Sequence, residues 1–253
     1  MSFSKCTAKH IFNISCKGAL LAVSSIISWH YFTEIPFAKS ESSLLAQSRR
    51  KLPTGRTRPI GADRDDCPRL PAGVPALTAL TDESGFTATL SQSPTFRFYT
   101  PYAKGKYQFR LRESRKSKKL LYSQDITRND QAGIFTVSLP KINAIKPRIN
   151  YFWELEYFCN NKPNPDSLIV FDWVYQDQLT ASQMAELREA KDSSDRIAFY
   201  RKYGIWLELL DEIAKLLPAS QTLWRQTLDT EGLQSVSKQP VLSIQSSPTP
   251  IKP

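Results

Sequence analysis

The segment YFWELEYF, residues 151–158, decides how the rest of this chain is interpreted. Six of its eight residues are apolar or aromatic, a density typical of a strand that is buried on both faces. Such a strand suits a central position in a sheet, between two partner strands. The partners of 151–158 are therefore expected among neighbouring segments that have the alternating pattern of half-buried strands.

Several segments on both sides of 151–158 show this alternation. Tyr107, Phe109 and Leu111 are separated by polar residues, as in a strand with one buried face. In all we expect about seven strands: 87–90, 96–99, 107–111, 120–125, 135–139, 151–158 and 169–175. No helical pattern lies between them, which argues against a parallel α/β sheet. We therefore predict an antiparallel, immunoglobulin-like β-sandwich over residues 67–176.

Residues 177–233 have a helical apolar period, and four short helices are expected there. Thr180 suits the start of the first helix, Gly204 suits the left-handed end of the second, and Pro218 stops the third. The stretch 200–218 resembles part of a tetratricopeptide repeat. The alternative is that these helices pack on the sandwich or on one another. The predicted fold class is α+β, a sandwich followed by a short C-terminal helical, tetratricopeptide-like domain.

Residues 1–46 are predicted to be a signal peptide or membrane-anchor leader. Lys5, Lys9 and Lys17 precede an uncharged, largely apolar run at 18–27, which is the arrangement of an export signal. A histidine and a glutamate interrupt the apolar character soon afterwards, which is unfavourable for a membrane-spanning helix. We expect export to the periplasm, the envelope or the exterior, and the alternative is anchoring in a membrane by the N-terminal segment.

Two further segments lack an apolar period. Residues 47–66 are rich in Arg, Pro, Thr and Gly and are expected to form a basic flexible linker. Residues 234–253 are rich in Ser, Pro and Gln and are expected to form a disordered tail. The whole chain has a formal net charge of +10 at pH 7, which favours negatively charged partners.

The cysteines and histidines limit the chemistry. Cys67 and Cys159 are the two cysteines left once 1–46 is removed, and in an exported protein such a pair usually forms a disulfide. Two free buried thiols are the alternative. Both histidines, His10 and His30, lie in the leader, so the processed protein would have no imidazole for catalysis or zinc binding. No Gly-rich phosphate loop is present, and we expect neither a metal nor a cofactor.

The order of several short motifs is distinctive. They are Cys67-Pro68, LTAL at 77–80, SPTFRFYTPY at 93–102, YFW at 151–153, DWV at 172–174 and GIW at 204–206. Over roughly residues 65–233 this order and spacing resembles the cyanobacterial domain-of-unknown-function family numbered 928. The resemblance implies a cyanobacterial envelope or secreted protein, and it supplies no activity.

Glu154 and Glu156 lie two residues apart on one face of the expected central strand. Paired carboxylates can carry out glycoside hydrolysis, but pairing with Arg or Lys across the sheet is the simpler interpretation. We therefore predict an exported, non-enzymatic binding or interaction protein of the cell envelope. The second hypothesis is a carbohydrate-binding or carbohydrate-active protein that uses carboxylates only. Nucleic acid is not an expected partner, because export separates the protein from chromosomal DNA.

Residues 104–119 contain eight basic residues and one acidic residue, Glu113. The pattern predicts a hairpin whose tip and second strand carry four cations: Arg115, Lys116, Lys118 and Lys119. A charged tip that only keeps the protein in solution is one interpretation. The functional hypothesis is that the tip and the basic segment 49–64 bind an envelope polyanion or polysaccharide. Two other partners are possible from the sequence: a membrane surface, and another protein bound through the helical domain.

Overall fold

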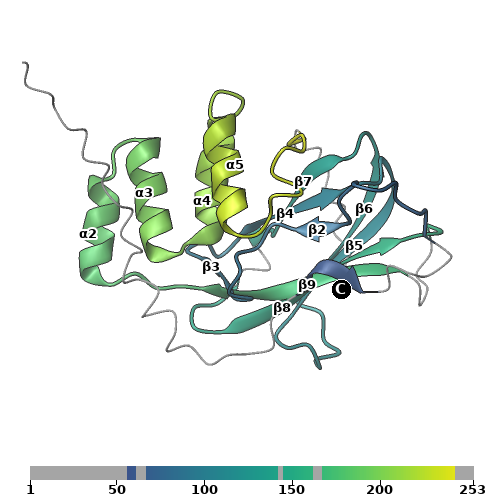
Figure 1. Cartoon of the computed structure of the whole chain (residues 1–253). Coiled ribbons are helices and arrows are strands. Elements are labelled where there is room, and N and C mark those ends of the chain that lie inside the picture. The colour runs from purple at the N-terminus through teal and green to yellow at the C-terminus, as the bar shows by residue number, and fades with distance from the viewer. Residues whose placement is uncertain (1–55, 61–66, 142–144, 162–166, 243–253) are drawn as a thin grey trace, which may run out of the picture. The chain divides into compact units, whose positions relative to one another are not determined.

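The computed structural model of the protein describes residues 56–60, 67–141, 145–161 and 167–242 (Figure 1). These residues belong to one compact unit, 39–253, while the unit 1–38 and with it most of the predicted leader lie outside the described part. Within the described part, no helix has the length and apolar character needed to cross a membrane.

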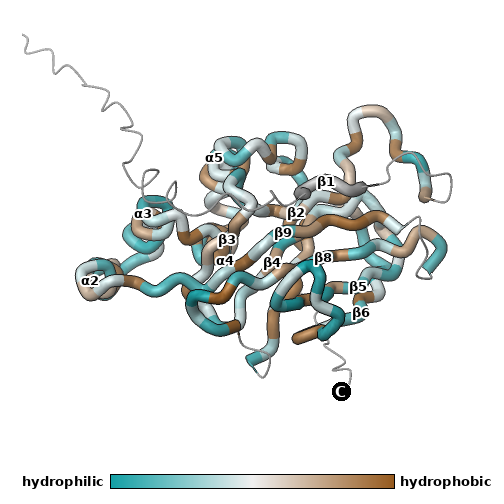
Figure 2. Tube along the Cα trace, turned by 90° about the horizontal axis from the view of Figure 1, so that it is seen from below, coloured by the Kyte–Doolittle hydropathy of each residue, from teal (hydrophilic) through white to brown (hydrophobic). Residues whose placement is uncertain are grey.

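The described residues form an α+β fold with strands β1–β9 followed by helices α2–α5. The strands are β1 (Arg56–Ile60), β2 (Thr78–Ala79), β3 (Thr87–Thr89), β4 (Thr95–Thr100), β5 (Lys104–Arg112), β6 (Tyr122–Asn129), β7 (Gly133–Ser138), β8 (Asn150–Phe158) and β9 (Leu168–Gln176). The helices are α2 (Ala181–Glu189), α3 (Ser193–Tyr203), α4 (Trp206–Lys215) and α5 (Gln221–Thr230). Figure 2 shows the hydrophobic stretches running along the strands.

Strand β8, which contains the segment 151–158, is a central strand of a six-stranded sheet, as its sequence predicts. The order in this sheet is β1-β9-β8-β5-β6, and β3 also pairs with β9. Trp153 of β8 lies between Leu111 of β5 and Asp172 of β9. The short strand β3 runs parallel to β9, so the sheet is mixed and not purely antiparallel as expected. No hairpin fixes the direction of β3, because β2 and β4, which flank it in sequence, both belong to the other sheet.

The second sheet has three strands in the order β2-β4-β7. It packs against the six-stranded sheet through a cluster of aromatic rings. Phe96 and Phe98 of β4 contact Phe109 and Trp153, with ring centroids 5.0–6.2 Å apart. All four side chains are buried. The aromatic residues Phe96 and Phe98 of β4 are therefore core residues.

The helices begin and end where their capping residues predict. The Thr180 side chain accepts a hydrogen bond from the Gln183 backbone and caps α2. The Asp192 side chain caps α3 in the same way, and Gly204 ends that helix with a φ of 66°. Ser220 directly precedes α5, and its side chain makes no capping hydrogen bond. Helix α2 packs on α3, and α3 packs on α4.

Helix α4 is docked on the outer side of the three-stranded sheet and on β3. The Trp206 Nε1 donates a hydrogen bond of 2.8 Å to the Leu80 carbonyl. The Glu208 Oε1 accepts from the Thr89 hydroxyl and from the backbone N–H groups of Leu90 and Ser91, at 2.7–2.9 Å. These bonds occupy backbone groups that follow β3 and would otherwise need another partner. The helical segment therefore covers the sheet, as one of the alternatives for these helices predicts.

Two segments differ from the expected domain boundaries. Residues 56–60, which we expected within a flexible linker, form β1 beside β9. Residues 234–242, which we expected within a disordered tail, pack against the fold, since Val236 is 0 % exposed and Val241 bridges to Ile134. The remainder of the linker and the tail lies outside the described residues.

Trp206 should contribute strongly to stability, because its ring is 4 % exposed and its indole N–H is bonded. We expect Trp206→Ala to lower the free energy of unfolding by about 3–5 kcal/mol, measured by chemical denaturation. Trp206→Phe keeps most of the ring and loses the hydrogen bond, so it should cost less than Trp206→Ala. A loss below about 1 kcal/mol for Trp206→Ala would mean that the ring does not hold α4 in place.

Candidate functional site

Cys67 and Cys159 are joined by a disulfide, with their Cα atoms 4.7 Å apart. The bond connects the chain ahead of β2 with the residue that follows β8, across a sequence separation of 92. The predicted pairing is therefore present, and the alternative of two free thiols does not apply. The bond fixes the start of the folded region to the end of the central strand.

The disulfide should stabilise the protein mainly by restricting the unfolded chain, because it closes a long loop. Reduction, or the double substitution Cys67→Ser and Cys159→Ser, should lower the free energy of unfolding by about 4 kcal/mol. Denaturation of the wild type with and without a reducing agent measures this loss. The double variant should be insensitive to the reducing agent. Equal stability of oxidised and reduced wild type would contradict the assignment.

The basic hairpin tip consists of Arg115, Lys116, Lys118 and Lys119, which lie in the connection between β5 and β6. All four residues are exposed. The strands pair in register, with Leu111 opposite Tyr122, and this register places the whole of 113–121 in the connection. The hairpin is as predicted, but β6 begins at Tyr122 and not at residue 120. Lys118 and Lys119 therefore belong to the turn rather than to the second strand.

One residue of the basic hairpin tip rests on the six-stranded sheet. The Arg115 guanidinium lies 4.8 Å from the centroid of the Phe171 ring, on β9. This is a cation–π contact, which holds the tip near the sheet without neutralising the charge. Phe171 also contacts Phe152, so the ring that Arg115 contacts is itself packed against a second aromatic ring. The sequence could not reveal this contact, because the position of the connection relative to β9 depends on the fold.

The basic strand residues beside the tip have acidic partners. Arg110 Nε and Arg112 Nη1 each lie 2.6 Å from Glu154 Oε1, and Arg110 also pairs with Glu156. The register explains this, because Arg110 is directly opposite Glu154 on β8. The preferred interpretation of Glu154 and Glu156 as ion-pair partners is confirmed. A hydrolytic pair would need one carboxylic acid that can give its proton to a substrate, whereas both carboxylates here are held by guanidinium groups.

The tip cations, in contrast, form no ion pair with any residue that the structure describes. Four cations so close together repel one another, and the repulsion depends on the salt concentration. The outer face of the six-stranded sheet thus has two electrostatic parts. One is the neutralised set of Arg110, Arg112, Glu154 and Glu156, and the other is the uncompensated basic hairpin tip. The second part can attract negative charge.

Two aspartates with raised pKa values, the buried Asp172 and the half-buried Asp82, were missed by the sequence analysis. Burial raises the pKa of Asp172 from 3.8 to about 7, and burial also raises that of Asp82 to about 6. Asp172 is 1 % exposed and accepts a hydrogen bond from the Trp173 backbone at 2.7 Å. Such a closed position offers a substrate no access to Asp172. Its raised pKa therefore bears on stability.

The raised pKa values predict that stability falls as the pH rises. The folded protein binds these protons more tightly than the unfolded chain, so the contribution is full below pH 3.8 and is lost as the pH rises through 6 and 7. The melting temperature should therefore decrease between pH 5 and pH 8, and Asp172→Asn should reduce this decrease.

The exposed residue Asp229 provides a matched control, and Asp229→Asn should leave the pH dependence unchanged. Glu212 does not interfere in this range. Its burial favours a higher pKa, but hydrogen bonds from Arg196, Lys215 and Ser193 outweigh burial and hold the pKa at about 2. A melting temperature of Asp172→Asn that follows the wild type from pH 5 to pH 8 would show that Asp172 is ionised throughout.

Possible metal ligands are dispersed. In the ranges that the structure describes, no three His, Cys, Asp or Glu side chains lie close enough to hold a metal ion.

The comparison with known proteins identifies a family and supplies no activity. No curated protein matches the chain. A family model, described as a domain of unknown function (DUF928), matches residues 55–241. This range contains every described strand and helix, from β1 to α5, together with the disulfide and the basic hairpin tip. The chain therefore belongs to the DUF928 family.

Proposed function

We propose that this protein is an exported, non-enzymatic protein of the cell envelope that binds an acidic polymer through its basic hairpin tip. One observation carries the proposal. Arg115, Lys116, Lys118 and Lys119 are all exposed, and none of them has an acidic partner in the described part of the chain. The neighbouring Arg110 and Arg112 are paired with Glu154 and Glu156, so the unpaired positive charge at this end of the hairpin lies in the turn.

The chemistry of the tip suits a polymer with repeated negative charges. Lysine is a flexible point charge that does not impose one geometry, and three of the four residues are lysines. Each exposed contact is weak, so affinity requires several contacts made together. The cation–π contact of Arg115 with Phe171 restrains the turn and lowers the entropy lost on binding. Acidic polysaccharide, lipopolysaccharide phosphate and anionic lipid all present such charges.

The disulfide supports export, because such bonds persist in oxidising compartments. The basic segment 49–64 is expected to add to the same interaction, although it lies largely outside the described residues. A protein partner held by the helical segment stays a prediction. The paired state of Glu154 and Glu156 leaves the carbohydrate-active hypothesis without its candidate acid and base.

The strand order supports the immunoglobulin-like arrangement that the sequence analysis predicted. The neighbouring strands β9-β8-β5-β6 of one sheet face the strands β2-β4-β7 of the other. Within each of these two sets the strands are antiparallel, and crossover connections join the two sheets. In such folds the connections at the ends of the sandwich are free to carry binding residues. The basic hairpin tip is one of these connections, which is the position we propose for the binding function.

The proposal is tested by replacing the four tip cations. The variant Arg115→Ser, Lys116→Ser, Lys118→Ser, Lys119→Ser should elute from a heparin column at a clearly lower salt concentration than the wild type. Its dependence of log affinity on log salt should also become less steep, because fewer ions are released. The melting temperature should be little changed, since these residues are exposed.

A matched control removes four exposed cations elsewhere, through Lys141→Ser, Lys146→Ser, Arg188→Ser and Lys191→Ser. It lowers the net charge equally and should retain most of the heparin affinity. Equal losses in the two variants would show that retention reflects only net charge, and the proposed site would be wrong. Parallel arms with acidic polysaccharide and with anionic lipid vesicles distinguish the source of the charge.

A further inference from the structure

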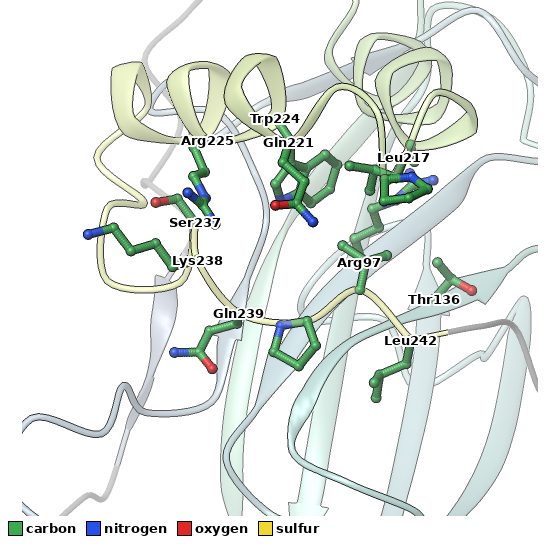
Figure 3. A pocket seen from close by; sticks show the side chains of 14 residues that line it. Arg97, Thr136, Leu217, Gln221, Trp224, Arg225, Ser237, Lys238, Gln239 and Leu242 are labelled. Carbon is green, nitrogen blue, oxygen red and sulfur yellow. The ribbon is translucent and has the colours of Figure 1, made fainter.

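A groove with a volume of about 760 Å³ lies beside helix α5 (Figure 3). We call it the α5 groove and define it by α5, the end of α4, the chain segment 237–242, and the pair Arg97 and Thr136. Its volume is in the range of sites for small molecules. It is remote from the basic hairpin tip, because Arg97 is on the outer face of the three-stranded sheet, whereas Phe171 is on the six-stranded sheet.

The walls of the α5 groove are held in place by hydrogen bonds. Arg97 and Thr136 are cross-strand neighbours on β4 and β7. The segment 237–242 runs along β7, because the Ile134 N–H donates to the Pro240 carbonyl at 2.7 Å and the Leu242 N–H donates to the Ile134 carbonyl at 2.8 Å. The groove is therefore largely formed before any ligand arrives.

The charge of the α5 groove is positive. Three cations line it, namely Arg97, Arg225 and Lys238, and no carboxylate is among its lining residues. Arg97 is fixed by an ion pair with Asp211 of α4. Arg225 and Lys238 are exposed and form no ion pair with a described residue. Figure 3 shows the Arg225 side chain directed toward Ser237, with Lys238 at the same end.

The opposite end of the α5 groove contains two leucines beside Arg97 and Thr136. Leu217 and Leu242 lie there, away from Lys238 (Figure 3). The ring of Trp224 lines the middle, and its Nε1 is a buried donor without an acceptor in the described part of the chain. Arg97 Nε is a second such donor.

We propose that the α5 groove binds an organic anion with a single apolar chain. The acidic head, a carboxylate, sulfate or phosphate, lies against the Arg225 guanidinium, at the end of the groove that Lys238 also lines. The apolar chain lies along Trp224 toward the end that Leu217 and Leu242 line. The absence of a lining carboxylate favours an anion over a cation or a sugar, and the two apolar leucines favour a chain over inorganic phosphate. This site is independent of the polymer-binding tip.

Dodecanoate, used below its micelle concentration, serves as the probe. We expect one dodecanoate bound per protein by titration calorimetry, with a change in tryptophan fluorescence from Trp224. Dodecanol has the chain without the charge, and acetate has the charge without the chain. Both should bind at least tenfold more weakly than dodecanoate. A lack of saturable dodecanoate binding, or equal affinity for dodecanol, would overturn the proposal.

Variants locate the site. Arg225→Gln should lower dodecanoate affinity at least tenfold and leave dodecanol binding unchanged, whereas Leu242→Ser should weaken both ligands. Arg188→Gln, an exposed arginine on α2, is the matched control and should bind like the wild type. The variant without the four tip cations should also bind dodecanoate normally, so failure of the polymer hypothesis and failure of this one are separable. Unchanged affinity in Arg225→Gln, with an unchanged melting temperature, would exclude the α5 groove.

Discussion

The contact of Trp153 with Phe96 and Phe98 is the constraint on which the rest of the structure depends. It joins the central strand β8 of one sheet to the central strand β4 of the other. Since these rings occupy the inward positions, every alternate residue of both strands faces outward. Arg97 and Glu154 are such residues, and each starts a different surface. The aromatic layer therefore determines both the neutralised face of β8 and the floor of the α5 groove.

The helical segment is best understood as the cover of one of these outer faces. Trp206 of α4 donates a hydrogen bond to a backbone carbonyl that follows β2, and Glu208 accepts one from a backbone N–H that follows β3. Asp211 of the same helix forms an ion pair with Arg97. Burial raises the pKa of Glu208, which shows how closed this junction is. Helix α5 and the segment 237–242 continue the cover less completely. The α5 groove is the space that remains between them and the sheet.

Local patterns in the sequence predicted the local structure well. Alternation found β5 and β9, and the density of apolar residues found β8. Thr180 and Gly204 marked helix ends because capping depends on neighbouring backbone groups. Strands β1 and β2 were missed. Strand β1 has five residues, one of them a proline, and β2 has two residues, so neither shows a readable period. The α5 groove could not be predicted at all. Arg97, Arg225 and Lys238 are distant in sequence, and only the packing of α5 on the sheet brings them together.

The distribution of charge links the fold to its proposed binding roles. Partly buried arginines are each matched with an acid, as in Arg97 with Asp211, Arg128 with Asp130 and Arg196 with Glu212. An unpaired charge there would be strongly destabilising. With a net charge of +10, the chain has fewer acids than cations, so the excess positive charge must remain at exposed sites. Two of these sites are organised by the fold, the basic hairpin tip on a ring of β9 and the cationic end of the α5 groove. The cations at these two sites have no acidic partner among the described residues and are exposed, so an anionic partner can reach them.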